Sequence, residues 1–424
     1  MSIVKKYLPL FILSTIISIR TLGQAAESPF TTFGIGERYG NAMVHNQGMG
    51  GVGIGTPQYW FLNNQNPALL VYNTLTIFEA GIIFESKKIN SDTLSEKSQA
   101  GNLNYLAMSF PIKPEKWTSS IGLMPYTNVD YRLQYQDPIM GSTNTATTTE
   151  VGSGGLTQVY WSNGVKLTPN LALGLKAAYI FSSVNNEYSN YVNDPSLPAT
   201  YKVSVAEQTY VRDFMFTGGI SYKLDSVFGG KYTFAAGAIY SFATNLNTKK
   251  TVKFSRDDLL DNVIDSLTLQ SVYGSLHIPQ EIGFGFSVGK IYKWTFGADF
   301  HYQDWSDFKS VDSEDEQGLT ASWAAMAGFE LTPDIYAVDN FFKRMTYRGG
   351  VSMEKYPFLV NNRQVKDFGI NFGFSVPAGR SSLNMAFRVG KRGNKSENIL
   401  EETYYKVYFG ITLNDQWFIK RKFD

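Results

Sequence analysis

Stretches of about ten residues, in which apolar side chains occupy every second position, recur from about Leu75 to the end of the chain. In Phe368–Val376, for example, Phe, Ile and Val alternate with Gly, Asn and Ser. Successive side chains of a β-strand point to opposite faces, so each stretch has one apolar face and one small or polar face. The stretches run nine to eleven residues, the length of a tilted membrane-spanning strand, whereas strands of soluble sandwiches average roughly five or six. The alternation therefore predicts strands that cross a bilayer.

The connections between these stretches fall into two classes that alternate along the chain. The short ones are Pro111–Lys116, Thr168–Asn170, Asp225–Gly230, Lys290–Tyr292 and Pro377–Arg380. The long, polar ones are Lys87–Gly101, Gln136–Gly154, Ser183–Glu207, Ala243–Ile278, Gln303–Leu319, Lys355–Val365 and Arg392–Glu402. Short turns at one end and long loops at the other are typical of an outer-membrane barrel, and only a closed barrel pairs every backbone group in lipid. We therefore expect an all-β fold, a transmembrane antiparallel β-barrel of about 14 strands over residues 75–414, with both termini periplasmic.

The apolar face of these stretches predicts which side chains contact lipid. They are Phe284, Phe286, Phe296, Phe300, Phe372, Phe374, Val407 and Phe409. The opposite face, which includes Gly285 and Gly373, is expected to line the lumen, because the two faces of a barrel strand alternate between lipid and lumen.

The overall composition excludes several classes of function. The chain has 38 basic and 37 acidic residues, a net charge of +1, whereas a nucleic-acid binder would be strongly basic. Without cysteine it forms no disulfide, thiolate metal site or thiol nucleophile. Its three histidines, His45, His277 and His301, offer little for metal or triad chemistry. We expect a protein that is not an enzyme, with no catalytic residues, no metal site, no cofactor and no nucleic-acid partner.

The N-terminal segment indicates export. Lys5 and Lys6 precede an apolar run of 13 residues, Tyr7–Ile19, and small residues follow as far as Gly23. This is the pattern of a signal peptide over residues 1–23, and the apolar run is too short to span a bilayer comfortably. The mature protein is therefore expected in the bacterial outer membrane.

Two further segments flank the predicted barrel. Residues 24–74 lack alternation and are rich in Gly, Asn and Gln, so we expect an N-terminal hatch that plugs a lumen too wide for side chains to fill. Residues 415–424 are expected to form a periplasmic tail.

Gly48–Gly53 matches GxGxxG, but no strand precedes it, so we expect tight packing rather than nucleotide binding. In one loop, Arg256–Asp265 is expected to form a short amphipathic helix.

Several motifs resemble the FadL family of outer-membrane channels for long-chain fatty acids and aromatic hydrocarbons. Asn66-Pro67-Ala68 precedes the first strand, and a later strand pair carries Pro279, Gly283, Asp299, Tyr302 and Trp305. The segments Ser28-Pro29-Phe30 and Trp417–Asp424 are similar to a Bacteroidota branch of that family. The resemblance implies a fourteen-stranded barrel plugged by a hatch that carries the Asn-Pro-Ala motif. Family barrels usually end at a terminal Phe, and this chain departs from that pattern because about ten residues follow its last strand.

Pro125 lies in the middle of the predicted third strand. Proline lacks the N–H that a strand ladder needs, and a closed barrel has no edge where that loss is harmless. We therefore expect a break or bulge at Pro125, Tyr126, Thr127 and Asn128; alternatively, Pro125 merely ends one strand before another begins. FadL-like barrels have a kinked third strand that opens a lateral window, so the resemblance implies a lateral opening at these residues.

Two functions remain open from the sequence. The first is a channel for hydrophobic small molecules with lateral release through the third strand. The second is a non-transporting FadL-like barrel that serves as a subunit of an outer-membrane secretion or protein-assembly complex, of the type IX translocon or barrel-assembly kind. Inward residues of the later strands are small or polar, which weakens the case for an apolar pocket. Expected partners are outer-membrane lipid and lipopolysaccharide, with a hydrophobic ligand for the first function or outer-membrane proteins for the second.

Overall fold

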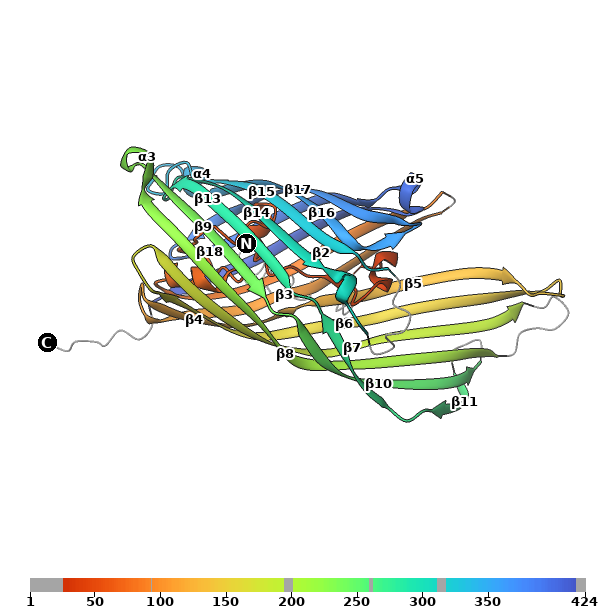
Figure 1. Ribbon diagram of the computed structural model, residues 1–424. Helices are drawn as coiled ribbons and strands as arrows, with labels where there is room; N and C mark the ends of the chain where they lie inside the picture. The colour runs from red at the N-terminus through yellow and green to blue at the C-terminus, as the bar shows by residue number, and fades with distance from the viewer. Residues whose placement is uncertain (1–25, 93, 194–200, 259–261, 311–317, 417–424) are drawn as a thin grey trace, which may run out of the picture.

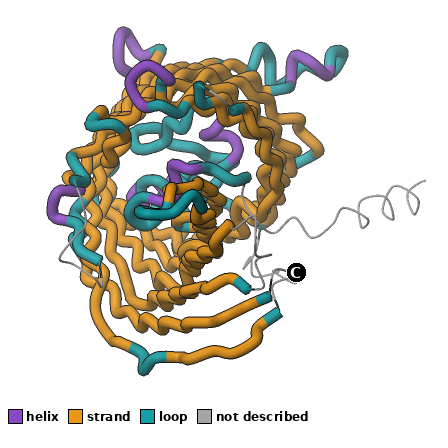
Figure 2. The backbone as a smooth tube through the Cα atoms, turned by 90° about the vertical axis from the view of Figure 1, so that its right-hand side faces the viewer, coloured by secondary structure: helices purple, strands orange, loops and turns teal. Residues whose placement is uncertain are grey.

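The computed structural model describes residues 26–416 except 93, 194–200, 259–261 and 311–317 (Figure 1). The predicted signal peptide and most of the predicted C-terminal tail lie outside the described residues. The described chain forms one antiparallel sheet that closes on itself, because its last strand pairs with the first strand of the wall (Figure 2). None of the helices in the described part of the chain is long and apolar enough to cross a membrane.

The wall of the barrel contains fourteen strands, which confirms the predicted fold. The uninterrupted strands are β2 (Thr76–Asn90), β3 (Ser95–Lys113), β6 (Thr145–Lys166), β7 (Leu171–Asn193), β8 (Lys202–Ser226), β14 (Trp294–Asp304), β15 (Ala321–Leu331), β16 (Thr346–Val360), β17 (Arg363–Ala378), β18 (Ser381–Gly393) and β19 (Glu401–Asp415). The interrupted strands are β4 (Trp117–Pro125) with β5 (Thr127–Pro138), β9 (Tyr232–Ser241) with β10 (Thr244–Asp257), and β11 (Val263–Thr268) and β12 (Val272–Ile278) with β13 (Glu281–Lys290). β19 pairs with β2 along its whole length and closes the barrel.

Residues 26–75 lie inside this ring of strands (Figure 2). Their regular elements are η1 (Pro29–Thr32), β1 (Glu37–Arg38), α2 (Val44–Gly48) and η2 (Pro67–Tyr72). The helix α2 packs on β16, β17, β18 and β19, whereas η2 packs on β4, β6, β7 and β8. The segment therefore contacts opposite walls of the lumen, and we refer to it as the hatch.

The hatch runs along the barrel from its long-loop end to its short-turn end. The N–H of Ala26 donates to the side chain of Glu85, near the long-loop end of β2, and the hatch leads into Thr76 at the other end of that strand. The first described residues therefore lie at the long-loop end, whereas β19 ends at the short-turn end. The sequence predicted both termini on the short-turn side, and the terminal residues themselves lie outside the described residues.

The predicted lipid-facing residues lie on the outer face of the wall. Phe284 is 57% exposed and Phe372 is 50% exposed. The other members of that set are exposed or half-buried on the same face. On the inner face, Gly285 lies so close to the hatch that an added Cβ would be 2.8 Å from the backbone nitrogen of Gly55. The alternation therefore identified both faces.

The five predicted short turns all lie at one end of the barrel, where they join β3 to β4, β6 to β7, β8 to β9, β13 to β14 and β17 to β18. A further connection at that end was not predicted: residues 332–345 link β15 to β16 through α4 (Phe341–Arg344). It exposes Tyr336 and Val338, which are 80% and 94% accessible. The remaining short helices are α3 (Val227–Gly230), η3 (Trp305–Asp307) and α5 (Lys395–Asn398).

Five predicted loops are wrong because most of each forms strand. They are Lys87–Gly101, Gln136–Gly154, Ser183–Glu207, Ala243–Ile278 and Lys355–Val365, which contain parts of β2, β3, β5, β6, β7, β8, β16 and β17 and all of β10, β11 and β12. The predicted helix over Arg256–Asp265 is also wrong, because β10 runs to Asp257 and β11 begins at Val263. These segments are rich in Thr, Ser and Asn, so their polar composition indicated loops although Thr favours strands. The long ends of β5, β6, β7, β8 and β10, together with β11, project beyond the rest of the wall (Figure 1).

Candidate functional site

The Asn66-Pro67-Ala68 motif begins η2 and seats the hatch against the wall. The Asn66 side chain accepts a hydrogen bond from the N–H of Ala68 at 3.0 Å and donates to the carbonyls of Ile54 and Ile220. The wall that faces this part of the hatch contains Gly174, Gly219 and Gly237, on β7, β8 and β9. A Cβ on Gly219 would lie 2.2 Å from Asn66 Oδ1, so a larger residue would displace the motif. The motif is a contact between hatch and wall.

Asp299, on the inner face of β14, holds the adjacent part of the hatch. Its carboxylate accepts hydrogen bonds from the N–H groups of Gly53 and Ile54 at 2.6 and 2.7 Å. Gly283, on the neighbouring β13, faces the same segment, and a Cβ there would lie 2.7 Å from the Ile54 side chain. Two of the five signature residues therefore contact this part of the hatch.

The other three signature residues lie nearer the long-loop end. The carbonyl of Pro279 accepts a hydrogen bond from the Gln303 side chain at 2.7 Å. Trp305 is buried, and its ring lies 5.9 Å from the guanidinium of Arg38 in β1. Tyr302 is 41% exposed. The structure distributes the signature residues along the strand pair and does not bring all five together in one site.

The glycine-rich run Gly48–Gly53 forms the end of α2 and the turn that follows it. Gly50 and Gly51 have φ values of 78° and 97°, a conformation that favours glycine. A Cβ on Gly50 would lie 2.8 Å from the carbonyl oxygen of Val351 on β16. The run therefore lets hatch backbone lie directly against the wall, as its composition predicted.

Glu37 in β1 joins the hatch to the wall through a buried cluster of charges. Its carboxylate lies 2.8 Å from Arg392, 3.1 Å from Lys87 and 3.1 Å from Lys406, which belong to β18, β2 and β19. Burial alone would raise the pKa of Glu37, but the three positive charges hold it well below its usual range. The other members of the cluster are Glu85, Asp367, Arg388 and Glu402. The carboxylate of Glu37 is therefore ionised and tied to three strands.

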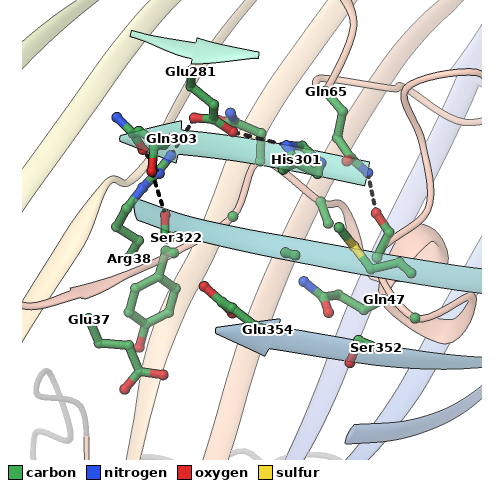
Figure 3. A pocket seen from close by; sticks show the side chains of 18 of the residues that line it. Glu37, Arg38, Gln47, Gln65, Glu281, His301, Gln303, Ser322, Ser352 and Glu354 are labelled. Carbon is green, nitrogen blue, oxygen red and sulfur yellow. Dashed lines mark hydrogen bonds and ion pairs between the residues drawn. The ribbon is translucent and has the colours of Figure 1, made fainter. Parts of the chain in front are cut away.

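A cavity of about 210 Å³ lies beside this cluster, between the hatch and the wall (Figure 3). The lining side chains labelled in the figure are Glu37, Arg38, Gln47, Gln65, Glu281, His301, Gln303, Ser322, Ser352 and Glu354. At one end Arg38 lies 2.7 Å from Glu281, which lies 2.9 Å from His301. The rest of the lining includes apolar and aromatic side chains such as Ile83, Trp323 and Met326, so the cavity is mixed, and an apolar solute in it would also lie against buried charges.

The histidines contact different partners. His301 pairs with Glu281, whereas the ring of His45 stacks on Phe61 with 4.8 Å between ring centres. Within the described ranges, no group of three or more His, Asp or Glu side chains is placed to hold a metal ion.

The third wall strand is interrupted at Tyr126, because β4 ends at Pro125 and β5 begins at Thr127. On one side the ladder continues, since the N–H of Tyr126 donates to the carbonyl of Leu156 in β6 at 2.8 Å. On the other side β3 pairs with β4 only as far as Leu123, and no pairing joins the described residues of β3 and β5. The wall therefore has a gap in its hydrogen-bond ladder between β3 and β5.

The first part of the hatch, residues 26–39, lies along this gap, and we refer to it as the strap. The N–H of Ser28 donates to the carbonyl of Asp130 in β5 at 2.8 Å. The N–H of Glu27 donates to the Ser98 hydroxyl in β3 at 2.9 Å. The strap therefore contacts both strands that border the gap.

The predicted lateral-opening residues lie at this covered gap. Thr127 and Asn128 stand opposite Arg38 and Glu37 of the strap in the β1–β5 pair. Tyr126 is buried, and its ring centre lies 5.9 Å from the Arg38 guanidinium. The structure brings these residues together with the strap, a contact that the sequence did not predict.

Three comparisons relate this chain to known proteins. The family model described as BamG matches residues 3–424. No curated protein sequence matches the chain. Among solved structures, the Pseudomonas putida toluene transporter TodX is similar with a TM-score of 0.58 and 15% identity, over 91% of this chain and 100% of that chain.

Two further solved structures have comparable TM-scores and sequence identities. The CymD monoaromatic hydrocarbon channel has a TM-score of 0.56 and 13% identity, over 91% of this chain and 99% of that chain. A Pseudomonas aeruginosa FadL homologue has a TM-score of 0.54 and 13% identity, over 89% of this chain and 98% of that chain. At these identities the similarity shows the fold, which is that of FadL-type barrels of the outer membrane.

Proposed function

Because the chain belongs to the BamG family, we propose that it is a non-transporting FadL-like barrel that serves as a subunit of an outer-membrane protein complex. The complex is one that assembles or secretes proteins, of the barrel-assembly or type IX translocon kind. The family assignment favours the barrel-assembly kind.

The observation that carries this proposal is the filling of the lumen by direct backbone contact between hatch and wall. On one side, Gly219 admits Asn66 so closely that a Cβ would overlap it. On another side, a Cβ on Gly328 or Gly350 would lie 2.2 or 2.3 Å from the backbone of Met49. Close packing of this kind leaves no space for a solute at the points of contact.

The remaining luminal space supports the same conclusion. An apolar solute in the cavity beside Glu37 would have to remove water from Arg38, Glu281 and their neighbours without replacing its hydrogen bonds. Removing water from buried polar groups in this way is unfavourable.

The test is purification of the full-length tagged protein from its native outer membrane in a mild detergent. We expect other outer-membrane proteins at stoichiometric amounts, retained after size-exclusion chromatography. Recovery of the barrel alone, with a fatty acid or aromatic hydrocarbon bound in its lumen, would contradict the proposal. Heat-modifiable migration on gels checks that the purified barrel is folded.

A second candidate function, release of a hydrophobic small molecule through the wall, is favoured by the gap between β3 and β5. The strand break at Tyr126 lies where the sequence predicted an opening, and apolar solutes are the cargo named for TodX and CymD. For this function the strap has to leave the gap, because it pairs with Thr127 and Asn128.

A disulfide that locks the strap tests this second function. The chain has no cysteine, so Arg38→Cys with Thr127→Cys introduces one pair at directly opposite positions. Ser382→Cys with Thr412→Cys is the control, a pair at opposite positions on β18 and β19. Release through the gap predicts that oxidation stops toluene uptake only in the strap variant and that a reductant restores it. Equal uptake by both oxidised variants rules out this route.

The Bacteroidota origin and a periplasmic position of the C-terminus belong to the same proposal. The terminal motifs support the first, and the position of the last strand's end at the short-turn side supports the second. An epitope added after Asp424 is expected to bind antibody only after the outer membrane is permeabilised. Labelling of intact cells would contradict a periplasmic C-terminus.

A further inference from the structure

Parts of β5, β6, β7, β8 and β10, with β11 and β12, form a sheet that projects from the long-loop end of the wall, and we refer to it as the projecting sheet (Figure 1). Its strands stay in register over the two rows given next, and the register of β10 and β11 shifts only after Arg256. One row of directly opposite residues consists of Leu133, Glu150, Tyr188, Val205, Phe254 and Leu267. The adjacent row on the other face consists of Gln134, Thr149, Ser189, Ser204, Ser255 and Ser266.

These two rows reverse the polarity of the wall below them. Val205 has the same alternation along β8 as Val211, which is buried in the lumen, so the apolar row belongs to the inner face. In the membrane-spanning part, the outer face is apolar and the inner face is small or polar. An antiparallel sheet with one apolar face normally has that face covered by a second layer. The apolar part of this face is a single row flanked by charged residues such as Glu207 and Arg256, and this row is what a second layer would cover.

No described element covers the apolar row. Phe254 is 40% exposed, Leu267 is 63% exposed and Tyr188 is 39% exposed. The aromatic residues of the strap do not reach them, because Phe30 and Phe33 stack on Phe358 of β16. The row is left open to whatever enters the long-loop end.

The charges on this face pair with one another. Glu207 lies 3.0 Å from Lys250, and Arg256 lies 2.7 Å from Asp265. Glu150, the charged member of the row, accepts a hydrogen bond from the Tyr135 hydroxyl at 2.8 Å. Phosphate groups need unpaired basic side chains, so this face does not fit lipopolysaccharide or nucleic acid.

The edges of the projecting sheet identify the chemistry of its partner. The carbonyl of Asp130 points away from β6 and meets the strap, and the alternate residues Arg132, Gln134 and Gln136 present their backbone groups to the same edge. At that edge the described residues place no further strand. At the opposite edge, His277 of β12 forms an antiparallel bridge with Lys309, and beyond this bridge the described residues place no further strand beside β11 and β12. Only another peptide backbone in extended conformation completes such an edge.

We propose that the projecting sheet binds a second, different polypeptide at the long-loop end of the barrel. The partner lays an uncharged, apolar, extended segment over the row from Leu133 to Leu267 and pairs with one of the free strand edges. This proposal rests on the proposed function, because it names the surface through which the subunit holds its neighbour.

The experiment compares substitutions on the two faces in the full-length tagged protein, expressed in its native outer membrane. Phe254→Glu and Leu267→Glu place a charge on the apolar row, and Ser255→Glu and Ser266→Glu are matched controls on the other face. We expect about a tenfold loss of co-purifying partner for the first pair and no loss for the controls, since hot-spot residues of an interface dominate its affinity. For the edge, Gln134→Pro is expected to weaken the complex and Gln134→Ala is not.

The outcomes separate this proposal from the proposed function. If the wild type co-purifies partners and every variant retains them, the projecting sheet is not the interface, and the subunit function still stands. If the wild type has no partner, the proposed function fails and the docking surface fails with it. A photo-reactive residue in place of Phe254 is expected to cross-link the same partner, with none from Ser255. Adducts only with lipopolysaccharide, or only with a second copy of this chain, overturn the proposal.

Discussion

The carboxylate of Glu37 lies 2.8 Å from the guanidinium of Arg392, although the two residues are 355 positions apart in the sequence. Glu37 belongs to the strap, and Arg392 is on the inner face of β18. The strap lies along the gap between β3 and β5, so the same contact that holds the strap also keeps the gap covered. The attachment of the strap should therefore depend on this buried charge cluster.

Glu37→Gln is expected to weaken the attachment of the strap by on the order of 3 kcal/mol, because it leaves buried cations without their anion. Hydrogen exchange of residues 26–39 is expected to accelerate, while exchange in β17 and β18 is unchanged. Glu27→Gln is the control, since Glu27 is an exposed strap residue outside the cluster. Equal protection of the strap in both variants would show that its backbone contacts with β5 suffice.

Gly219→Ala is expected to displace the Asn66-Pro67-Ala68 motif, because its Cβ would lie 2.2 Å from Asn66 Oδ1. Overpacking of this kind destabilises proteins by about 1–3 kcal/mol. The neighbouring Gly218→Ala is the control, since its Cβ would meet only the Tyr240 carbonyl oxygen at 4.0 Å. Limited proteolysis of the hatch in detergent compares the two variants. Identical cleavage would show that the close contact with Gly219 does not hold the Asn66-Pro67-Ala68 motif in place.

The barrel could be predicted from the sequence because alternation acts locally. A strand face such as that of Phe284 and Phe372 is read from neighbouring residues, and lipid requires it to be apolar. The positions of the short turns could be predicted for the same reason, because each turn lies where the local alternation stops. The projecting sheet was missed because it lies outside lipid: the row that contains Ser204, Ser255 and Ser266 is polar, so composition indicated loops where the backbone continues as strand.

The contacts of the hatch could not be predicted from spacing. Glu37, Lys87 and Arg392 meet only because β1 lies within the closed barrel, and nothing in the local sequence links them. A partial signal was present: Lys406 alternates with Tyr405 and Val407 and is therefore an inward charge that needs a partner. The identity of that partner depends on the path of the hatch, which lacks any periodic pattern.

His45 predicts how the hatch responds to pH. Burial lowers the pKa of His45 well below its ordinary value, and the charge of Arg348 lowers it further, so the ring is neutral in the folded hatch. An unfolded hatch takes up a proton below about pH 6.5, the usual value for His. The free energy of hatch unfolding is therefore expected to fall as the pH falls below that value.

The variant His45→Phe keeps a ring against Phe61 but cannot be protonated. Thermal unfolding between pH 7.5 and 5.5 is expected to show a smaller decrease in stability for this variant than for the wild type. The same decrease in both would place the pH dependence elsewhere in the barrel.

The last prediction tests the assignment of lipid and lumen faces on β17. Phe372 is the middle member of the outward residues Phe368, Ile370, Phe372, Phe374 and Val376, and its ring stacks on Phe387 at 4.8 Å. Phe372→Arg is expected to destabilise the folded barrel by about 2–4 kcal/mol, the effect of a basic side chain near the bilayer midplane. Phe372→Leu, which stays apolar, is the control.

Gly373→Arg tests the other face, where a Cβ would lie 3.1 Å from the Cα of Gly48, so it is expected to displace the hatch. Urea titrations in lipid vesicles measure barrel stability, and proteolysis measures hatch displacement. If Phe372→Arg folds as well as Phe372→Leu, or if Gly373→Arg leaves the hatch protected, the face assignment on this strand is wrong.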